Sequence, residues 1–169
     1  FRAEYSTSHL LECDFTDNEA GSRGGAIRLS SNNKSKGYST FERCLIARNK
    51  VKEGTGSAVC VQHAQRTAIV NSTIYGNIAT SGGAVFANGK NNDYKNELLI
   101  ISCTLAGNEG DGQLQLAGVQ NLKFINSIIC GDNLATEEGD GNLLDDYAAV
   151  FGDATLTNGV LKPLATVKA

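Results

Sequence analysis

The acidic side chains that could carry out hydrolysis or hold a cation gather near the C-terminal end of the sequence. Glu137, Glu138, Asp140, Asp145 and Asp146 lie within one short stretch. Glycoside hydrolases need two carboxyl groups on either side of the scissile bond, and calcium prefers carboxylate oxygens. A solvated turn accounts for the adjacent Asp145 and Asp146 equally well. We therefore expect no catalytic residue, no metal ion and no cofactor, with weak calcium binding by this stretch as the alternative.

Histidine and cysteine show no metal-site pattern. His9 and His63 lie far in the sequence from the acidic stretch. The cysteines are separated by 31, 16, 43 and 27 residues and include no C-x-x-C pair: Cys13, Cys44, Cys60, Cys103 and Cys130. Zinc sites use much closer ligand pairs. We expect small buried core residues, with one disulfide as the alternative.

Charge and hydropathy argue against two classes of partner. The formal net charge is −3, and the 15 Lys and Arg residues form no basic run, so we expect no nucleic-acid partner. No apolar run approaches the ~18 residues that cross a bilayer, so we expect no membrane span in this chain. The chain starts at Phe1 rather than Met, which indicates a processed product or part of a longer parent chain.

The elements that must position these side chains repeat along the sequence. Taking a small residue as origin, successive copies lie 31, 28, 31 and 24 residues apart: Cys13, Cys44, Ser72, Cys103 and Ser127. An apolar residue stands two positions later: Phe15, Ile46, Ile74, Leu105 and Ile129. Another stands three positions earlier: Leu10, Phe41, Ile69, Ile100 and Phe124. Five positions after the origin come Asn18, Asn49, Asn77, Asn108 and finally Asp132. Such coincidence of independent columns is typical of a repeat protein.

A glycine-containing block follows each asparagine of the first four copies. Each block has the period of two that is typical of a β-strand, so two apolar residues of the block face the same side. These pairs are Ile27/Leu29, Val59/Val61, Val85/Ala87 and Leu114/Leu116. The residues between them are expected to face outward: Arg28, Cys60, Phe86 and Gln115. Glycine at the start of the block permits a sharp turn into the strand, where a Cβ atom would collide.

Units of 24–31 residues with short strands and no helical period predict an all-β, single-stranded parallel β-helix. Coils that stack at ~4.8 Å would place each column in register. We expect about five to six coils, with regular coils over residues 1–133. We expect residues 134–169 to form an irregular terminal coil or tail of the same domain.

Vertical stacking explains the asparagine column. Asn18, Asn49, Asn77 and Asn108 are expected to form a structural ladder, in which each side-chain amide bonds the next. Asn also tolerates the left-handed backbone that a tight bend demands, so the ladder residues themselves are expected to take that conformation. Asp132 should mark the end of the regular stack.

These motifs resemble the repeats of the polymorphic outer-membrane proteins, which combine F-x-x-N with G-G-A-[ILV]. Phe15–Asn18 with Gly24–Ile27 matches both, and Ile74–Asn77 with Gly82–Val85 matches with Ile for Phe. The resemblance covers about residues 8–133. It implies a right-handed coil and a secreted or bacterial cell-surface, outer-membrane-associated protein of the adhesin type. It does not by itself imply a ligand, because the motifs occupy structural positions.

Loops are the expected place for function, because the coils hold them while their sequence varies. Residues 30–37, 62–67 and 88–97 should leave the same edge of the stack. Candidate ligand contacts in and beside the last loop are Phe86, Asn88, Lys90, Asn92, Tyr94 and Lys95. We expect Tyr94 to offer an aromatic platform and the loop to fold over Phe86.

We therefore expect a non-enzymatic module for adhesion, with a glycan or a host or neighbouring protein as partner. The alternative is a fragment of a pectate-lyase-like lyase or glycoside hydrolase, and a third is a pure spacer. Open coil ends expose unpaired strands, so we expect a partner or further coils to cap them.

Overall fold

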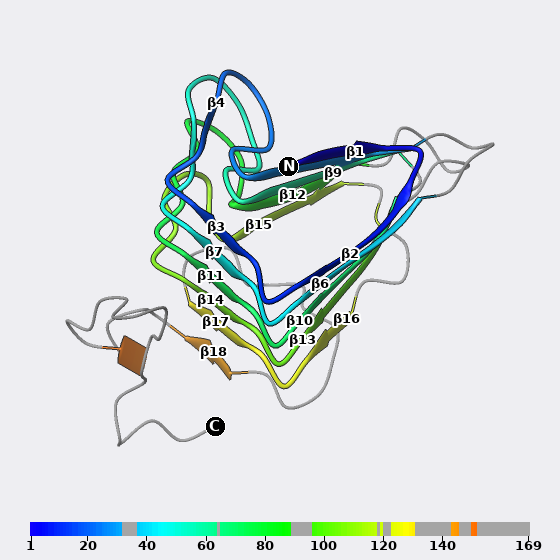
Figure 1. Ribbon diagram of the computed structural model, residues 1–169. Coiled ribbons are helices and arrows are strands. Elements are labelled where there is room, and N and C mark those ends of the chain that lie inside the picture. The colour runs from blue at the N-terminus through cyan, green and yellow to red at the C-terminus, as the bar shows by residue number, and fades with distance from the viewer. Residues whose placement is uncertain are drawn as a thin grey trace.

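The computed structural model describes residues 1–31, 37–63, 65–88, 96–117, 119, 123–130, 143–145 and 150–151. Their strands form three long parallel sheets, A, B and C, which surround a roughly triangular interior in Figure 1. The predicted all-β parallel solenoid is confirmed.

Each sheet takes one strand from each turn of the chain. Sheet A contains β1 (Arg2–Glu4), β5 (Ile27–Ser30), β9 (Val59–Gln62), β12 (Val85–Asn88) and β15 (Leu114–Ala117). Sheet B contains β2 (Thr7–Leu11), β6 (Tyr38–Glu42), β10 (Arg66–Val70), β13 (Glu97–Ile101) and β16 (Lys123–Ile125). Sheet C contains β3 (Asp14–Thr16), β7 (Leu45–Ala47), β11 (Thr73–Tyr75), β14 (Thr104–Ala106), β17 (Ile128–Cys130) and β18 (Leu143–Asp145). A short fourth pair joins β4 (Glu19–Ala20) to β8 (Lys50–Val51).

The chain visits sheets A, B and C in turn, and each strand pairs in parallel with its equivalent one turn later. Seen from its N-terminal end in Figure 1, the chain runs clockwise as it recedes, so the coil is right-handed. It makes about four full turns from β1 to β15 before β16, β17 and β18. The predicted five to six coils were slightly too many.

Columns of like residues fill the interior, as the repeat predicted. Phe41, Ile69, Ile100 and Phe124 are fully buried, as are Ile46, Ile74, Leu105 and Ile129. At the N-terminal end the rings of Phe1, Phe15 and Phe41 pack edge to face, with centroids 6.3–6.4 Å apart. The core is therefore a continuous stack rather than a set of separate layers.

Left-handed residues turn the chain at two corners. At the corner between sheets B and C the φ values are 49–54° in every copy: Glu12, Arg43, Asn71, Ser102 and Asn126. At the other end of sheet C, Asp17, Arg48, Gly76 and Gly107 take φ values of 55–63°. The expectation that the ladder asparagines are themselves left-handed was wrong. The residue before each one makes the turn, which leaves the asparagine free to face the interior.

A stacked ledge of loops separates sheet C from sheet A. Residues 19–26, 50–58, 78–84 and 109–113 rise away from the coil at β4 in Figure 1 and return to sheet A. Backbone bridges join them between turns, from Lys50 to Ile78 and from Ile78 to Glu109. Gly24, Gly56 and Gly82 have φ values of 65–71° where the ledge re-enters sheet A, as the glycine block predicted.

The described part of the predicted tail continues sheet C. β18 pairs in parallel with β17, and Ile129 lies opposite Leu144. Val150 and Phe151 have helical backbone and are buried against Ala106 and Cys130. This part of residues 134–169 therefore packs on the coil.

Candidate functional site

The asparagine ladder is present and structural. Asn49 Oδ1 accepts from Asn18 Nδ2, and Asn77 Oδ1 accepts from Asn49 Nδ2, both at 2.9 Å. Asn108 Oδ1 continues the file by accepting from Asn77 Nδ2 at 2.8 Å. Asn108 Nδ2 then donates to Gln113 of its own turn, and Asp132 lies outside the described residues. Asn49 and Asn77 are fully buried with their amides hydrogen-bonded, so they are unsuited to catalysis.

The Cys/Ser column forms a second ladder whose bonds the sequence did not predict. Each side chain donates to the carbonyl two residues before it, as Ser72 Oγ does to Val70 at 2.8 Å and Cys103 Sγ to Ile101 at 3.2 Å. Ser72 Oγ also accepts from the Cys44 amide at 3.0 Å. A small hydroxyl or thiol is thus required at this corner for hydrogen bonding as well as for space.

The thiols are unsuited to nucleophilic chemistry. None of the five cysteines forms a disulfide in this structure, and four of them are buried, as the core interpretation predicted. Burial raises the pKa of Cys60 and of Cys103 to about 11. The thiolate is the reactive form, so both groups are inert near neutral pH.

The edge between sheets A and B is the one at which the predicted loops leave. Ser30, Gln62 and Asn88 are in register at the ends of β5, β9 and β12. The loop that begins after Asn88 ends at Asn96, which is fully buried and whose Nδ2 donates to the Val61 carbonyl at 3.3 Å. The predicted common edge is therefore confirmed.

The predicted ligand-contact residues are placed only in part. Phe86 lies on the outer face of sheet A, in register with Cys60 and Gln115, and is half-buried, as is Asn88. Lys90, Asn92, Tyr94 and Lys95 lie outside the described residues, so the predicted cover over Phe86 stays a prediction. Cys60 points outward as predicted but is fully buried, because the ledge residue Gly56 packs against it.

The outer face of sheet B begins directly beyond this loop edge. Its first column, next to the loops, contains Thr7, Tyr38, Arg66 and Glu97. Its second column contains His9, Thr40, Ala68, Leu99 and Lys123. Its third contains Leu11, Glu42, Val70, Ile101 and Ile125. The third column thus becomes aliphatic toward the C-terminal turns, whereas the first is polar or charged apart from the Tyr38 ring.

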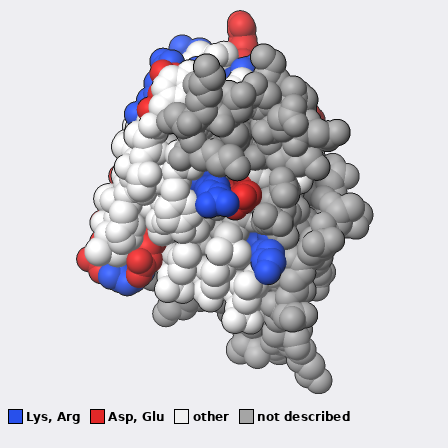
Figure 2. Space-filling model, turned by 90° about the vertical axis from the view of Figure 1, so that its right-hand side faces the viewer, with Lys and Arg blue, Asp and Glu red and all other residues white. Residues whose placement is uncertain are grey.

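A hollow of about 190 Å³ lies in this face, and Figure 2 shows the face with few charged groups among uncharged ones. Ala68 and Leu99 form its floor, where the small Ala68 lies between Thr40 and Leu99 in the column. The remaining lining side chains on the outer face stand around it: Tyr38, Arg66, Glu97 and Lys123. We call these six residues the sheet B hollow.

Polar groups of defined geometry surround the apolar floor. Arg66 contacts both carboxylate oxygens of Glu97: Nε lies 2.9 Å from Oε2, and Nη2 donates to Oε1 at 3.1 Å. This bidentate pairing holds the two side chains in one orientation. Tyr38 is 46% exposed, and its ring belongs to the rim. Lys123 adds a second cation, so the hollow has two positive groups and one negative one. It can bind a ligand with an apolar surface and polar edges.

The sheet B hollow is not evident from the repeat pattern of the sequence. One sequence signal points to the floor of the hollow. Side chains of a strand alternate between its two faces, so the residue before each buried residue of the Phe41, Ile69 and Ile100 column faces outward. Reading Thr40, Ala68 and Leu99 as one outward file would have shown a small residue in a surface column. The rim needed the structure, because Tyr38 and Glu97 follow loops of different length.

Comparisons with protein-family models, with curated proteins and with solved structures find no match. Within the described residues, no helix is long and apolar enough to cross a membrane. The same part of the chain contains no group of three or more His, Cys, Asp or Glu side chains placed to hold a metal ion.

Proposed function

We propose that this protein is a non-enzymatic recognition module, secreted or on a bacterial cell surface, that binds a glycan in adhesion. The observation that carries the proposal is the sheet B hollow. It combines a flat aliphatic floor, Ala68 and Leu99, with an aromatic ring at its rim, Tyr38. The rim also holds the oriented Arg66–Glu97 pair.

A sugar ring matches that combination. Pyranose rings have apolar C–H faces and hydroxyl groups around their edges, so they pack on aromatic and aliphatic surfaces while their edges form hydrogen bonds. The volume of about 190 Å³ is below the ~300 Å³ of common drug-sized pockets, which suits one terminal sugar rather than a long chain. Glu97 can accept from a hydroxyl group and Lys123 can donate to one.

The position of the hollow joins it to the predicted recognition loops. Tyr38 and Glu97 are the first strand residues after the segments 32–36 and 89–95, each one residue beyond a corner residue, Gly37 or Asn96. Those segments, with Tyr94 among their residues, lie outside the described residues. The proposed glycan site therefore consists of the hollow and of the described edge that adjoins it. The adhesin resemblance of the repeat motifs supports the same proposal.

The paired state of Glu97 favours binding over hydrolysis. A glycoside hydrolase acts through two carboxyl groups about 5–10 Å apart, one of them available as an acid. Among its lining residues the hollow has a single carboxylate, and that carboxylate is paired with the Arg66 guanidinium at 2.9 Å. The lyase or hydrolase alternative stays a rival that the experiment below tests.

A glycan array with the whole chain tests the proposal. We expect binding to a restricted set of glycans, and Tyr38→Ala should weaken it at least about tenfold, because ring stacking and area burial are both lost. Leu11→Ala is the control: it removes a 44%-exposed side chain from the same face, near its N-terminal end. It should leave the affinity within twofold.

Three results would contradict the proposal. The first is equal loss of binding in the Tyr38 and Leu11 variants, which would indicate non-specific adsorption. The second is turnover of polygalacturonate or alginate with calcium, read as unsaturated product by absorbance and as new reducing ends. The third is absence of any bound glycan together with capture of a purified protein ligand, which would replace glycan recognition by protein recognition.

A further inference from the structure

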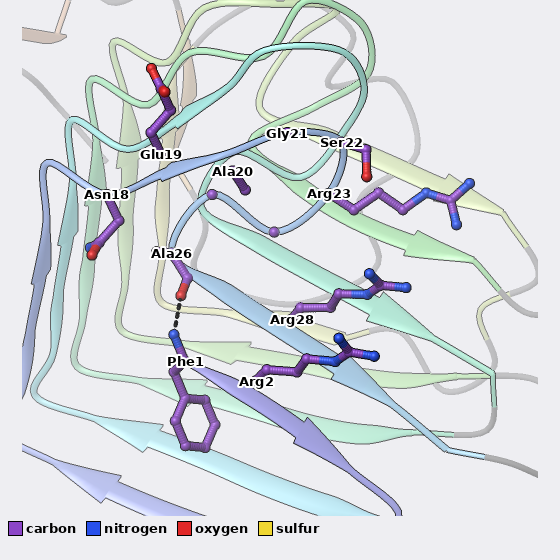
Figure 3. A pocket seen from close by; sticks show the side chains of 12 residues that line it. Phe1, Arg2, Asn18, Glu19, Ala20, Gly21, Ser22, Arg23, Ala26 and Arg28 are labelled. Atoms are coloured by element: carbon purple, nitrogen blue, oxygen red, sulfur yellow. Dashed lines mark hydrogen bonds between the residues drawn. The ribbon is translucent and has the colours of Figure 1, made fainter.

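A second hollow, of about 490 Å³, opens at the N-terminal end between the ledge and sheet A. Three of its lining residues are arginines: Arg2 on β1, Arg28 on β5, and Arg23 in the ledge loop between β4 and β5. Figure 3 shows the three side chains extending toward the same side of the hollow, one above another. We call Arg2, Arg23 and Arg28 the arginine triplet.

Backbone register brings the triplet together. Arg2 and Arg28 are paired residues of adjacent parallel strands, so their side chains leave the same face one strand apart. Arg23 lies in the ledge loop that returns to β5, and in Figure 3 its side chain extends to the same side as that of Arg28. On the outer face of sheet A, the residues in register with Arg2 and Arg28 in the following turns are Cys60 and Phe86. In this column the arginines therefore occur only in the first two strands.

Carboxylates compensate this charge only in part. Arg2 Nε donates to Glu4 Oε1 at 3.1 Å, and this contact holds the pKa of Glu4 below its ordinary value. Glu19 also lines the hollow, but its carboxylate contacts Lys52 at 2.7 Å. Among the described residues, neither Arg23 nor Arg28 forms a direct ion pair, although Arg28 also contributes to lowering the pKa of Glu4. The hollow is therefore positive although the whole chain has a net charge of −3.

One guanidinium atom is also left without a partner. Arg28 Nη2 makes a long hydrogen bond of 3.4 Å to Gln62, whereas Arg28 Nε is buried and has no hydrogen-bond partner among the described residues. Leaving a buried donor of a charged group unpaired costs free energy. Planar guanidinium groups bind carboxylate and sulfate with two hydrogen bonds each.

We propose that the arginine triplet binds an acidic oligosaccharide through a sulfate or carboxylate group of one of its sugars. The volume of about 490 Å³ far exceeds the ~30 Å³ of a water molecule and is in the range of small-molecule pockets, so a bare ion would not fill it. Across the hollow from the arginines in Figure 3 lie Asn18 and Glu19.

This site is separate from the sheet B hollow and does not depend on the proposed function. Isothermal titration calorimetry with the whole chain tests it, using four probes: a sulfated heparin hexasaccharide, an oligogalacturonate hexamer, neutral cellohexaose and inorganic sulfate. We expect binding of at least one charged hexasaccharide and none of cellohexaose. Inorganic sulfate should bind at least about tenfold more weakly, because it leaves most of the hollow empty. Higher salt should weaken the binding.

Two single variants and a matched control locate the site. Arg23→Gln, which changes an exposed side chain, should weaken binding about tenfold, since a charge-assisted hydrogen bond is lost. Arg28→Gln should do the same. Arg43→Gln removes one positive charge at the corner between sheets B and C and should change the affinity less than twofold. Tyr38→Ala should have no effect.

Three outcomes would overturn the proposal. The first is that neither charged hexasaccharide binds the unmodified chain. The second is equal affinity for inorganic sulfate and the hexasaccharides, which would define a simple anion site. The third is equal weakening by Arg23→Gln and Arg43→Gln with unchanged thermal stability, which would show that overall charge rather than the triplet attracts the ligand.

Discussion

Asn77 accepts two hydrogen bonds from Asn49 of the preceding turn through a single oxygen. The backbone N–H and the side-chain Nδ2 of Asn49 both donate to Asn77 Oδ1, each at 2.9 Å, and both residues are completely buried. Asn77 Nδ2 also donates to the Ile46 carbonyl at 2.9 Å. One side chain therefore satisfies backbone groups of another turn as well as its ladder neighbours.

Asn77→Ala should destabilise the fold by about 2–4 kcal/mol, because several buried groups lose partners at once. Asn18→Ala is the control, since Asn18 is exposed at the end of the ladder and accepts no side-chain bond from the described residues. It should cost about 1 kcal/mol. Urea denaturation followed by circular dichroism measures both. Equal costs would show that the ladder does not act as a hydrogen-bonded file.

Gly83→Ala should destabilise by about 1–3 kcal/mol through overpacking. A Cβ atom at Gly83 would lie 2.6 Å from the Leu114 carbonyl carbon and 2.7 Å from the Gln115 nitrogen, both backbone atoms of the next turn. Ser57 stands at the equivalent position one turn earlier and tolerates its Cβ, although its hydroxyl is buried without a partner among the described residues. Ser57→Gly should therefore change stability by less than about 1 kcal/mol. A thermal melt that ranks the two variants in the opposite order would contradict the close-approach argument.

Alkaline pH should destabilise the protein through its buried thiols. The pKa of Cys60 and of Cys103 rises from 9.0 to about 11 on folding, so between these values the unfolded chain loses the protons that the folded chain keeps. This contribution to stability is complete below pH 9 and is lost as the pH rises toward 11. The loss is at most about 1.4 kcal/mol per pH unit for each thiol.

Cys103→Ser removes one of these thiols and keeps the hydrogen-bonding role, since Ser72 and Ser127 fill the same column. Its free energy of unfolding, measured with urea at several pH values, should fall less steeply above pH 9 than that of the unmodified chain. Identical slopes would mean that Cys103 does not titrate differently on folding.

Ala68→Leu should fill the sheet B hollow without harming the fold. Ala68 faces outward on β10 between Thr40 and Leu99, so a longer side chain extends into the hollow and not into the core. We expect glycan affinity to fall more than about tenfold while the melting temperature changes by less than a few degrees. Retained affinity at unchanged stability would mean that the ligand binds elsewhere.

Much of the fold could be predicted from the sequence because parallel turns stack like residues on like. The core columns at Ile46 and Ile69, the ladder at Asn49 and the turn at Gly56 each recur in neighbouring turns, so every copy confirms the others. The loop edge after Asn88 followed from the same register. The left-handed backbone conformation was predicted at the ladder asparagines but occurs at the residue before each of them. Residue type alone does not determine which residue of a bend adopts that conformation.

The two hollows could not be predicted in this way because neither repeats. Each arises where one turn departs from the column: the small Ala68 on sheet B, and the ledge opening beside Arg2 and Arg28 on sheet A. Cys60 shows the same limit, since its outward direction followed from alternation whereas its burial depends on the ledge.

The sequence by itself determined the parallel stack, its inward-facing columns and its asparagine ladder. These features depend on short patterns that recur in each turn, so that equivalent residues stack on one another. Only the tertiary structure decided which outward side chains are covered by loops and which ones come together around the same hollow. Burial and convergence depend on loops from other turns, whose paths no periodic pattern encodes.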